Sequence, residues 1–320
     1  MREIGKLGLG GAPLGNLFER IPDAVAQATV AAAWECGIRH FDTAPHYGAG
    51  LSEHRMGAAL RGREGFTLST KVGRLLEPAE GVPELDEGFV GALPFRRRFD
   101  YSAAGTMRSI EDSLQRLGRS RVDIVYIHDL SEDWHGAEWR ARFAEAMRGA
   151  APALTRLKHE GVIGAWGLGV NLVAPCLAAL EQAAPDLFLI AGRYTLLDQG
   201  ALGALMPACA ARGVRLVLGG PYNSGLLAGG TTFNYEAAPA DMVRRAQAIG
   251  AVCARHGVAL KAAALQFCAA PAMVASVIPG ARTPAEVTEN AAMLAAPVPA
   301  ALWHELKRAG LLPEGAPTPP

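Results

Sequence analysis

The chain alternates short apolar segments with amphipathic helical segments from one end to the other. The apolar segments lie at residues 7–12, 38–43, 67–71, 122–128, 162–170, 187–193, 215–220 and 275–279. Such alternation is typical of parallel strands joined by crossover helices, and eight strands are the number that closes a (β/α)8 barrel. Runs such as VDIVYI and RLVLGG are apolar throughout, which fits strands buried on both faces. We therefore predict an α/β fold, a TIM barrel, with a short N-terminal segment that caps the base of the barrel.

The segments between the predicted strands have the periodicity of helices. Residues 106–117 place apolar side chains three or four positions apart, with Ser102 or Thr106 as the candidate cap and Gly118 as the end. Residues 24–36 and 240–256 show the same pattern, and a glycine ends each of them. No linker divides the chain, so we expect a single domain over residues 1–320. The last residues, PEGAPTPP, are expected to be frayed.

Two segments are too long for tight turns between a strand and a helix. Residues 73–101 and 221–239 are rich in Gly, Pro and aromatic residues, and both follow strands that end on the expected active rim. Long irregular loops in a compact domain are usually lids or binding loops. We expect irregular functional loops here, with simple surface decoration as the alternative.

Charge and cysteine content exclude several classes of function. The 31 acidic and 31 basic residues balance, which argues against a nucleic-acid or membrane-surface partner. We interpret the one basic cluster, Arg96, Arg97 and Arg98, as a solvated loop face. The five cysteines are widely spaced and form no CxxC pair, which predicts reduced, mostly buried thiols rather than a disulfide scaffold or a zinc site.

No part of the sequence has the pattern of a secretory signal or a membrane span. The beginning, MREIGKLGLG, lacks a long apolar region, and the most apolar stretches are interrupted well before the roughly 20 residues that span a bilayer. We expect a cytoplasmic protein with no membrane partner, and the sequence does not specify an oligomeric state.

Four chemically active residues follow predicted strands. They are Asp42 and Tyr47 in GIRHFDTAPHYG, Lys71 at the end of FTLSTK, and His128 at the end of VDIVYIH. The strand ends of a parallel barrel converge on one rim, where catalytic groups gather. Tyrosine ionises near about pH 10; a nearby ammonium lowers that pKa, and a carboxylate keeps the ammonium charged. Taken singly, each residue is as readily a packing, surface, turn-cap or hydrogen-bonded buried group. Together they predict a proton-transfer site with Tyr47 as general acid/base.

Four sequence blocks resemble the aldo-keto reductases. GIRHFDTAPHYG, STK, VDIVYIH and IPGARTPAEVTEN look like successive signature blocks of that family, in the right order and over nearly the whole chain. The resemblance implies a single-domain barrel that transfers hydride between a nicotinamide cofactor and a carbonyl or alcohol. It places the family's proton-transfer tetrad on Asp42, Tyr47, Lys71 and His128. Hydride transfer needs no metal, and we expect none.

The resemblance also implies an extended dinucleotide across the rim. Asn171 would then hydrogen-bond the nicotinamide carboxamide, because an amide can both donate and accept. Further contacts are implied after the seventh strand and in the C-terminal block, at Gly219, Pro221, Gly225, Leu227, Gly280, Arg282, Glu286 and Asn290. The glycines of Gly8–Gly11 are expected instead to allow close backbone packing at the barrel mouth.

Several positions depart from the family pattern. Val170 replaces a common Ser, Ala191 a Gln, and Gly219 an aromatic residue, for which Tyr222 is a possible substitute. In members that prefer NADPH, a Lys and an Arg grip the 2′-phosphate; those positions are Gly280 and Glu286 here. Loss of cations and gain of an anion disfavour a phosphate dianion, whereas an acidic group can accept from a free ribose hydroxyl. We therefore expect NAD as cofactor; Arg282 is the retained cation through which NADP could bind.

The segments GGAPLGNLF, RYTLLDQ and GGPYNSGLLAGG look most like the sugar-oxidising branch of the family. We expect oxidation of the anomeric hydroxyl of an aldose, of the L-fucose or D-arabinose type, to a lactone. Candidate sugar contacts are His46, Asp129, Trp134 and Tyr222, each of which is as readily an ordinary loop residue. The alternatives are an NAD(P)H-dependent aldehyde or ketone reductase, a pyridoxal 4-dehydrogenase, and a cofactor-binding regulatory subunit.

Overall fold

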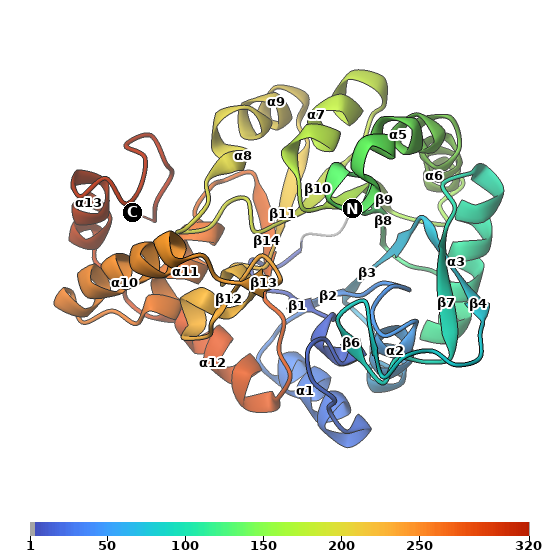
Figure 1. Ribbon diagram of the computed structural model, residues 1–320, viewed down its shortest axis with the longest axis horizontal. Helices are drawn as coiled ribbons and strands as arrows, with labels where there is room; N and C mark the ends of the chain where they lie inside the picture. Colours follow the sequence, from blue (N-terminus) through green and yellow to red (C-terminus); the bar gives the residue numbers. More distant parts are fainter. Residues whose placement is uncertain (1–3, 320) are drawn as a thin grey trace.

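The computed structural model describes residues 4–319 and shows eight parallel strands in one sheet (Figure 1). In their spatial order they are β1 (Leu9–Gly10), β2 (His40–Asp42), β3 (Thr67–Val72), β8 (Ile124–His128), β9 (Ala165–Val170), β10 (Leu187–Ala191), β11 (Arg215–Gly219) and β14 (Val274–Ile278). The amide of Gly8 donates to the carbonyl of Val277 at 2.9 Å, and that of Gly10 to Pro279 at 3.0 Å. These bonds join the last strand to the first, so the predicted barrel is confirmed.

Close backbone packing explains the glycines around β1. A Cβ atom on Gly10 would lie 2.9 Å from the carbonyl oxygen of Ile278, and one on Gly11 would lie 2.6 Å from that of Asp42. Only glycine allows the first strand to fit between its two neighbours at this distance. Ile4 is buried among residues that point into the barrel, including Tyr126 and Val217. The predicted N-terminal segment therefore reaches the barrel interior from residue 4 onward.

Helices cover the outside of the barrel (Figure 1). They are α1 (Asp23–Glu35), α2 (Leu51–Ala59), α3 (Ala103–Leu117), α4 (Glu132–His135), α5 (Trp139–Arg148), α6 (Ala150–His159), α7 (Val173–Gln182), α8 (Gly200–Gly203), α9 (Leu205–Arg212), α10 (Ala240–Arg255), α11 (Leu260–Ala269), α12 (Pro284–Ala295) and α13 (Ala300–Arg308). The predicted cap of α3 is confirmed, because Ser102 Oγ accepts from the amide of Gly105 at 3.0 Å. Gly118 ends that helix with φ 61°.

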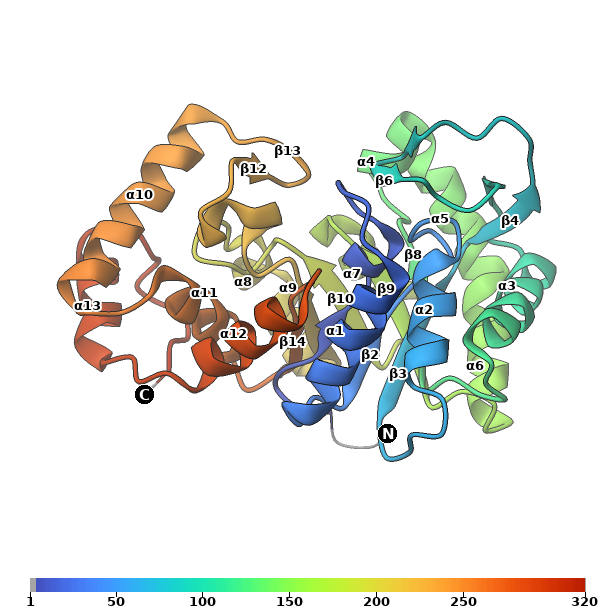
Figure 2. The same ribbon diagram turned by 90° about the horizontal axis from the view of Figure 1, so that it is seen from below.

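The two long segments are not irregular, so the prediction of irregular loops is wrong. The first contains β4 (Arg74–Pro78) paired with β7 (Phe95–Phe99), and β5 (Leu85–Asp86) paired with β6 (Phe89–Val90). The second contains the short helix η3 (Asn223–Ala228) and the pair β12 (Thr232–Phe233) and β13 (Glu236–Ala237). Two-residue turns with positive φ, at Glu87–Gly88 and Asn234–Tyr235, close the β5–β6 and β12–β13 hairpins. The insertions follow β3 and β11, and both lie at the end of the barrel where the carboxyl ends of the strands meet (Figure 2).

The basic cluster is only partly a solvated face. Arg98 is exposed, but the side chain of Arg97 is 3 % exposed and pairs with Asp86, and its Nε donates to the carbonyl of His46 at 3.0 Å. Arg97 therefore ties the β5–β6 hairpin to the loop after β2. Sequence alone does not distinguish it from its neighbours, because the hairpin that buries it is itself a tertiary feature.

The end of the chain and the cysteines also differ in part from expectation. Ala316 is buried and the Tyr194 hydroxyl donates to the carbonyl of Pro317 at 3.1 Å, so the described part of PEGAPTPP is packed rather than frayed. Pro320 lies outside the described residues. The cysteines are free; four are buried, but Cys36 is exposed.

No single helix within residues 4–319 is long and apolar enough to cross a membrane. The bent pair of α10 and α11 passes that test by length and composition alone.

Candidate active site

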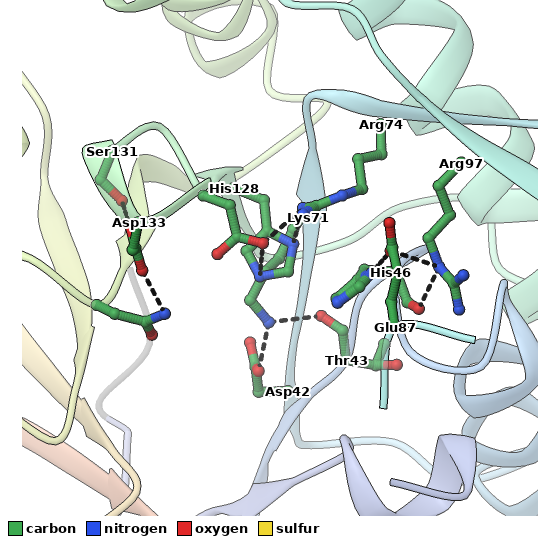
Figure 3. A network of polar contacts seen from close by, with 12 residues as sticks. Asp42, Thr43, His46, Lys71, Arg74, Glu87, Arg97, His128, Ser131 and Asp133 are labelled. Atoms are coloured by element: carbon green, nitrogen blue, oxygen red, sulfur yellow. Dashed lines mark hydrogen bonds and ion pairs between the residues drawn. The ribbon is translucent and has the colours of Figure 1, made fainter. Parts of the chain in front are cut away.

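A buried ion pair forms the floor of the site at the carboxyl ends of β2 and β3. Lys71 Nζ donates to Asp42 Oδ2 at 2.6 Å and to the carbonyl of Thr43 at 2.9 Å (Figure 3). Ser69 Oγ donates to the other carboxylate oxygen of Asp42, also at 2.6 Å. Because both charged side chains are 2 % exposed or less, each depends on the other for its charge. Asp42 and Lys71 thus meet as the sequence predicts.

Tyr47 lies directly above this pair. Lys71 Nζ is 4.7 Å from the centroid of the Tyr47 ring, and the ring centroids of Tyr47 and His128 are 5.9 Å apart. The loop after β2 holds Tyr47 against the N-terminal segment, where Gly15 makes the closest contact. A Cβ atom at residue 15 would lie 2.5 Å from the carbonyl carbon of Tyr47. Glycine at this position therefore sets how deeply Tyr47 is placed.

The expected lowering of the Tyr47 pKa is wrong for this structure. Burial raises the pKa of the phenol well above its usual value, and the carboxylates of Asp42 and Asp129 raise it further. Arg74 offsets only part of this effect. The physical reason is that burial disfavours the charged phenolate, and the two carboxylates add to this effect. Tyr47 is therefore a neutral phenol and a proton donor around neutral pH.

His128 is a buried imidazole that also stays neutral. Burial, together with the positive charges of Lys71 and Arg74, lowers the pKa of His128 well below its usual value. A neutral ring has one N–H donor and one acceptor nitrogen. His128 can therefore donate a hydrogen bond to an oxygen in the pocket without competing for the proton of Tyr47.

The four predicted residues stand beside a pocket of about 550 Å³. Tyr47, Lys71 and His128 line it, while Asp42 lies behind Lys71. Residues that sequence reasoning did not single out also line the pocket, among them Leu17, Phe18, Glu87, Phe89, Asp133, Arg193, Asn223, Ser224, Asn234, Tyr235 and Glu236. They come mostly from the two insertions, and their only signal in the sequence is the length of those segments.

Three of the four predicted substrate contacts lie at the pocket. His46 packs edge-on against Trp134 with ring centroids 5.3 Å apart, and Asp129 pairs with Arg74 at 2.6 Å. Burial lowers the pKa of His46 well below its usual value, so its ring is neutral. Tyr222 does not line the pocket; its hydroxyl donates to Asn290 Oδ1 at 2.7 Å. The prediction of Tyr222 as a substrate contact is therefore not supported, because η3 turns its ring toward α12.

The predicted cofactor residues lie at or after the carboxyl ends of β9, β11 and β14. Asn171 lines the pocket, where its Nδ2 donates to Asp133 at 2.9 Å. Gly219 ends β11, while Pro221, Gly225 and the buried Leu227 belong to the η3 segment. Gly280 lies between Gly10 and the start of α12, which carries Glu286 and the buried Asn290. Apart from Asn171, these residues do not line the pocket, and the hydrogen bond from Tyr222 to Asn290 joins the η3 segment to α12.

Comparison with known proteins agrees with this geometry. The model of the aldo/keto reductase family matches residues 6–310. The chain is 41 % identical to D-threo-aldose 1-dehydrogenase of a Pseudomonas species, over 97 % of this chain and 95 % of that protein. It is 40 % identical to pyridoxal 4-dehydrogenase of Microbacterium luteolum, over 96 % and 94 %.

A solved aldo-keto reductase from Bacillus halodurans, in its holo form, superimposes with a TM-score of 0.72. It is 25 % identical and the match covers 95 % of this chain and 92 % of that one. Three findings agree: the barrel closes between β14 and β1, the family model matches residues 6–310, and two enzymes are about 40 % identical to the chain. The chain belongs to the aldo/keto reductase family and is an enzyme of the oxidoreductase type.

Proposed function

We propose that the protein is an NAD-dependent dehydrogenase that oxidises the anomeric hydroxyl of an aldose to a lactone. The observation that carries this proposal is the convergence of Tyr47, Lys71 with Asp42, and His128 at the floor of one pocket. The identity of 41 % to a D-threo-aldose 1-dehydrogenase supports the substrate class. The catalytic roles that follow belong to the proposal.

Each residue of the tetrad has one task. Tyr47 exchanges a proton with the reacting oxygen, because it is the hydroxyl group that lines the pocket beside His128. His128 donates a hydrogen bond to the same oxygen and orients it. Lys71, held by Asp42, stabilises negative charge that develops on Tyr47 during oxidation.

The pocket and the segments that follow β9, β11 and β14 fit a nicotinamide dinucleotide. When bound, the nicotinamide supplies the group that accepts or gives the hydride. Among the described residues, the buried Oδ1 of Asn223 has no hydrogen-bond partner, although it lies at the pocket. A buried acceptor without a partner is costly, and a carboxamide or ribose donor would satisfy it. Asn171, Asn223 and the backbone of the η3 segment would hold the nicotinamide half, and the start of α12 would hold the adenosine half.

Charges at the start of α12 support the preference for NAD. Arg282 pairs with Glu286 at 2.9 Å and with Glu19 at 3.2 Å. One guanidinium between two carboxylates leaves a net negative charge, which repels a 2′-phosphate dianion. The same carboxylates can accept from the two hydroxyls of an unphosphorylated ribose. Arg282, the cation through which NADP could bind, is thus already paired with carboxylates of the protein.

The rest of the pocket suits an uncharged polyol. Glu87, Asp133 and Glu236 add acceptor oxygens around the mouth, while Arg193 is paired with Asp198 at 2.8 Å. Carboxylates accept hydrogen bonds from sugar hydroxyls, and an aromatic ring packs against the apolar face of a sugar. Trp134 is the aromatic candidate for that contact, although Arg74 lies 4.4 Å from its ring centroid.

Initial rates with a panel of substrates and both cofactors test the proposal. We expect NAD⁺-dependent oxidation of L-fucose or D-arabinose to exceed oxidation of pyridoxal and of simple alcohols in kcat/KM. Glu286→Gln should raise kcat/KM for NADP⁺ by about threefold to tenfold, because it removes one repulsive charge at an exposed pair. A wild-type preference for NADP⁺, or no aldose oxidation, would contradict the proposal.

A second candidate is pyridoxal 4-dehydrogenase activity, which the 40 % identity to that enzyme supports. The same proton-transfer residues would serve both reactions. The apolar side chains at the pocket mouth, Leu17, Phe18 and Phe89, would contact an aromatic substrate. The pyridoxal arm of the panel therefore decides between the two candidates.

A further inference from the structure

Arg74 is a buried cation next to the proposed catalytic histidine. Its side chain is 2 % exposed, and its guanidinium carbon lies 4.4 Å from the ring centroids of both Phe99 and Trp134. Nη1 donates to Asp129 Oδ2 at 2.6 Å and lies 3.4 Å from His128 Nδ1 (Figure 3). Among the described residues, Nη2 has no hydrogen-bond partner. Burial of a guanidinium costs several kcal/mol unless it is paired, so its only full compensation is the carboxylate of Asp129.

Asp129 is equally dependent on Arg74. The residue has φ 51°, a left-handed conformation that costs an L-amino acid roughly 1 kcal/mol or more. Its amide still donates to the carbonyl of Gly169 at 2.9 Å, which extends the pairing of β8 with β9 by one residue. Burial raises the pKa of Asp129 to about 6, and Arg74 acts in the opposite direction. The backbone therefore turns this carboxylate inward, where the guanidinium keeps it ionised around neutral pH.

The pair constrains the proton on His128. A guanidinium N–H can only donate, so the nitrogen that faces it, Nδ1, must keep its lone pair. The other nitrogen, Nε2, lies 3.6 Å from Asp129 Oδ2, which is attractive for an N–H but longer than a hydrogen bond. Both contacts favour a proton on Nε2. That N–H remains available to an oxygen in the pocket, which His128 lines.

We propose that Arg74, held in place by Asp129, is a positioning residue that keeps His128 neutral and in the Nε2–H tautomer. The proposal rests on the proposed function, in which His128 donates a hydrogen bond to the reacting oxygen. Without the cation, the Nδ1–H tautomer and the imidazolium become accessible. Neither presents the same single donor beside Tyr47. The other charged or titratable groups that face this ring are Lys71, His46, Tyr47 and Asp129 itself.

The tautomer can be measured without substrate or cofactor. In protein with ¹⁵N-labelled histidine, two-bond ¹H–¹⁵N spectra report which ring nitrogen carries the proton, and His128→Gln assigns the signal. We expect wild-type His128 to be the neutral Nε2–H form from pH 8 down to the acidic limit of folding. In Arg74→Met we expect a mixture of tautomers, a pKa shifted upward, and kcat/KM reduced by about tenfold to a hundredfold. Arg74→Lys keeps a positive charge and should therefore show smaller changes in the tautomer ratio and in kcat/KM than Arg74→Met.

Removal of one partner of a buried pair also destabilises the fold, so stability and positioning must be separated. The double variant Arg74→Met/Asp129→Asn removes both charges and should recover most of the melting temperature. If the pair acts on His128, the tautomer mixture and the low kcat/KM persist in the double variant. If the tautomer and rate recover with stability, the pair is merely structural and the proposal is overturned.

A matched control is the largely buried pair of Arg116 and Glu53 at 2.6 Å, neither of which lines the pocket. Arg116→Met should destabilise the fold comparably and leave the His128 spectrum unchanged. If the folded Arg74→Met variant keeps the wild-type tautomer and pKa of His128, the proposal is contradicted. The proposed function fails differently, since an active Tyr47→Phe enzyme would contradict it whatever the tautomer of His128.

Discussion

Backbone strain in this protein is concentrated at the pocket. Seven of its lining residues other than glycine have positive φ, namely Phe18, Glu87, Asp129, Asn223, Ser224, Asn234 and Tyr235. A left-handed conformation costs an L-residue roughly 1–2 kcal/mol, and such residues cluster where side chains must be aimed at a ligand. Glu87, Asn234 and Tyr235 have this conformation because they form hairpin turns, so the strain at Phe18, Asp129, Asn223 and Ser224 is the part that agrees with the proposed site.

Replacement of Tyr47 tests the central assignment at the residue scale. Tyr47→Phe removes the hydroxyl that we propose transfers the proton, and it should lower kcat by about 10² or more with cofactor binding nearly intact. The melting temperature should change little, since the ring is retained. Tyr194→Phe, which removes a hydroxyl bonded to Pro317, is the matched control and should keep the wild-type rate. A Tyr47→Phe enzyme with more than a third of wild-type kcat would refute the assignment.

The raised pKa of Tyr47 predicts opposite pH profiles for the two directions of reaction. Burial, with Asp42 and Asp129, keeps the phenol protonated around neutral pH. Reduction of a carbonyl uses this protonated form, whereas oxidation of a hydroxyl needs the base. We expect kcat/KM for oxidation to rise with pH throughout the alkaline range in which the protein stays folded, and kcat/KM for reduction not to rise. Steady-state rates in both directions, with salt held constant, provide the test. Oxidation that is independent of pH above neutrality would contradict it.

At the scale of elements, the barrel and its insertions have different roles at the site. The strands hold Asp42, Lys71 and His128 rigidly at their carboxyl ends, whereas two small hairpins complete the pocket wall. The residues of β12–β13 are only partly buried or exposed, and Tyr235 is 49 % exposed. Elements with few buried contacts open at a low free-energy cost. The β12–β13 hairpin can thus be altered without loss of the fold.

Removal of the β12–β13 hairpin should separate binding from stability. Replacement of residues 232–237 with two glycines deletes Asn234, Tyr235 and Glu236 from the pocket but leaves the barrel intact. We expect KM for sugar or cofactor to rise by about tenfold, which corresponds to about 1.4 kcal/mol of lost contacts. The melting temperature should fall by only a few degrees. Steady-state rates measure KM, and thermal melts measure the melting temperature. A large drop in melting temperature with unchanged KM would show that the hairpin contributes to stability and not to binding, which contradicts the prediction.

At the scale of the whole molecule, the barrel interior carries unpaired polar groups below the site. Among residues 4–319, both ring nitrogens of His40, the hydroxyl of Tyr126 and that of Ser276 are buried without a hydrogen-bond partner. Burial lowers the pKa of His40 to about 4, and burial likewise depresses those of His46 and His128. Unfolding exposes these histidines to water, where an imidazole has a pKa of about 6.5.

The difference in histidine pKa between the folded and unfolded states predicts that the protein loses stability in acid. A lowered folded-state pKa contributes stability that is fully present above about pH 6.5 and is lost as the pH falls through about 4. For His40 alone the loss amounts to about 3 kcal/mol. Urea unfolding between pH 7 and 4 measures it. His40→Leu should reduce the slope of the unfolding free energy against pH by up to one proton. His304→Leu, on the exposed side of α13, should leave that slope unchanged. An unchanged slope in His40→Leu would show that this ring is not the acid-sensitive group.

The sequence by itself determined the eight strands, the cap and end of α3, and the four residue types at the strand ends. These features depend on periodicity and on short-range chemistry, which neighbouring residues specify. The placement of a residue at the end of a parallel strand also follows from the topology, which explains why Asp42 and Lys71 could be predicted to meet across 29 positions.

Only the tertiary structure decided the ionisation of those residues and the composition of the pocket wall. The phenol of Tyr47 is neutral because burial and two carboxylates outweigh the nearby cations. Arg74 faces His128 and Asp129 because two aromatic rings from distant segments enclose it, and Arg282 is held between Glu19 and Glu286. Burial and charge pairing are sums over groups that are remote in the chain, so no local pattern in the sequence encodes them.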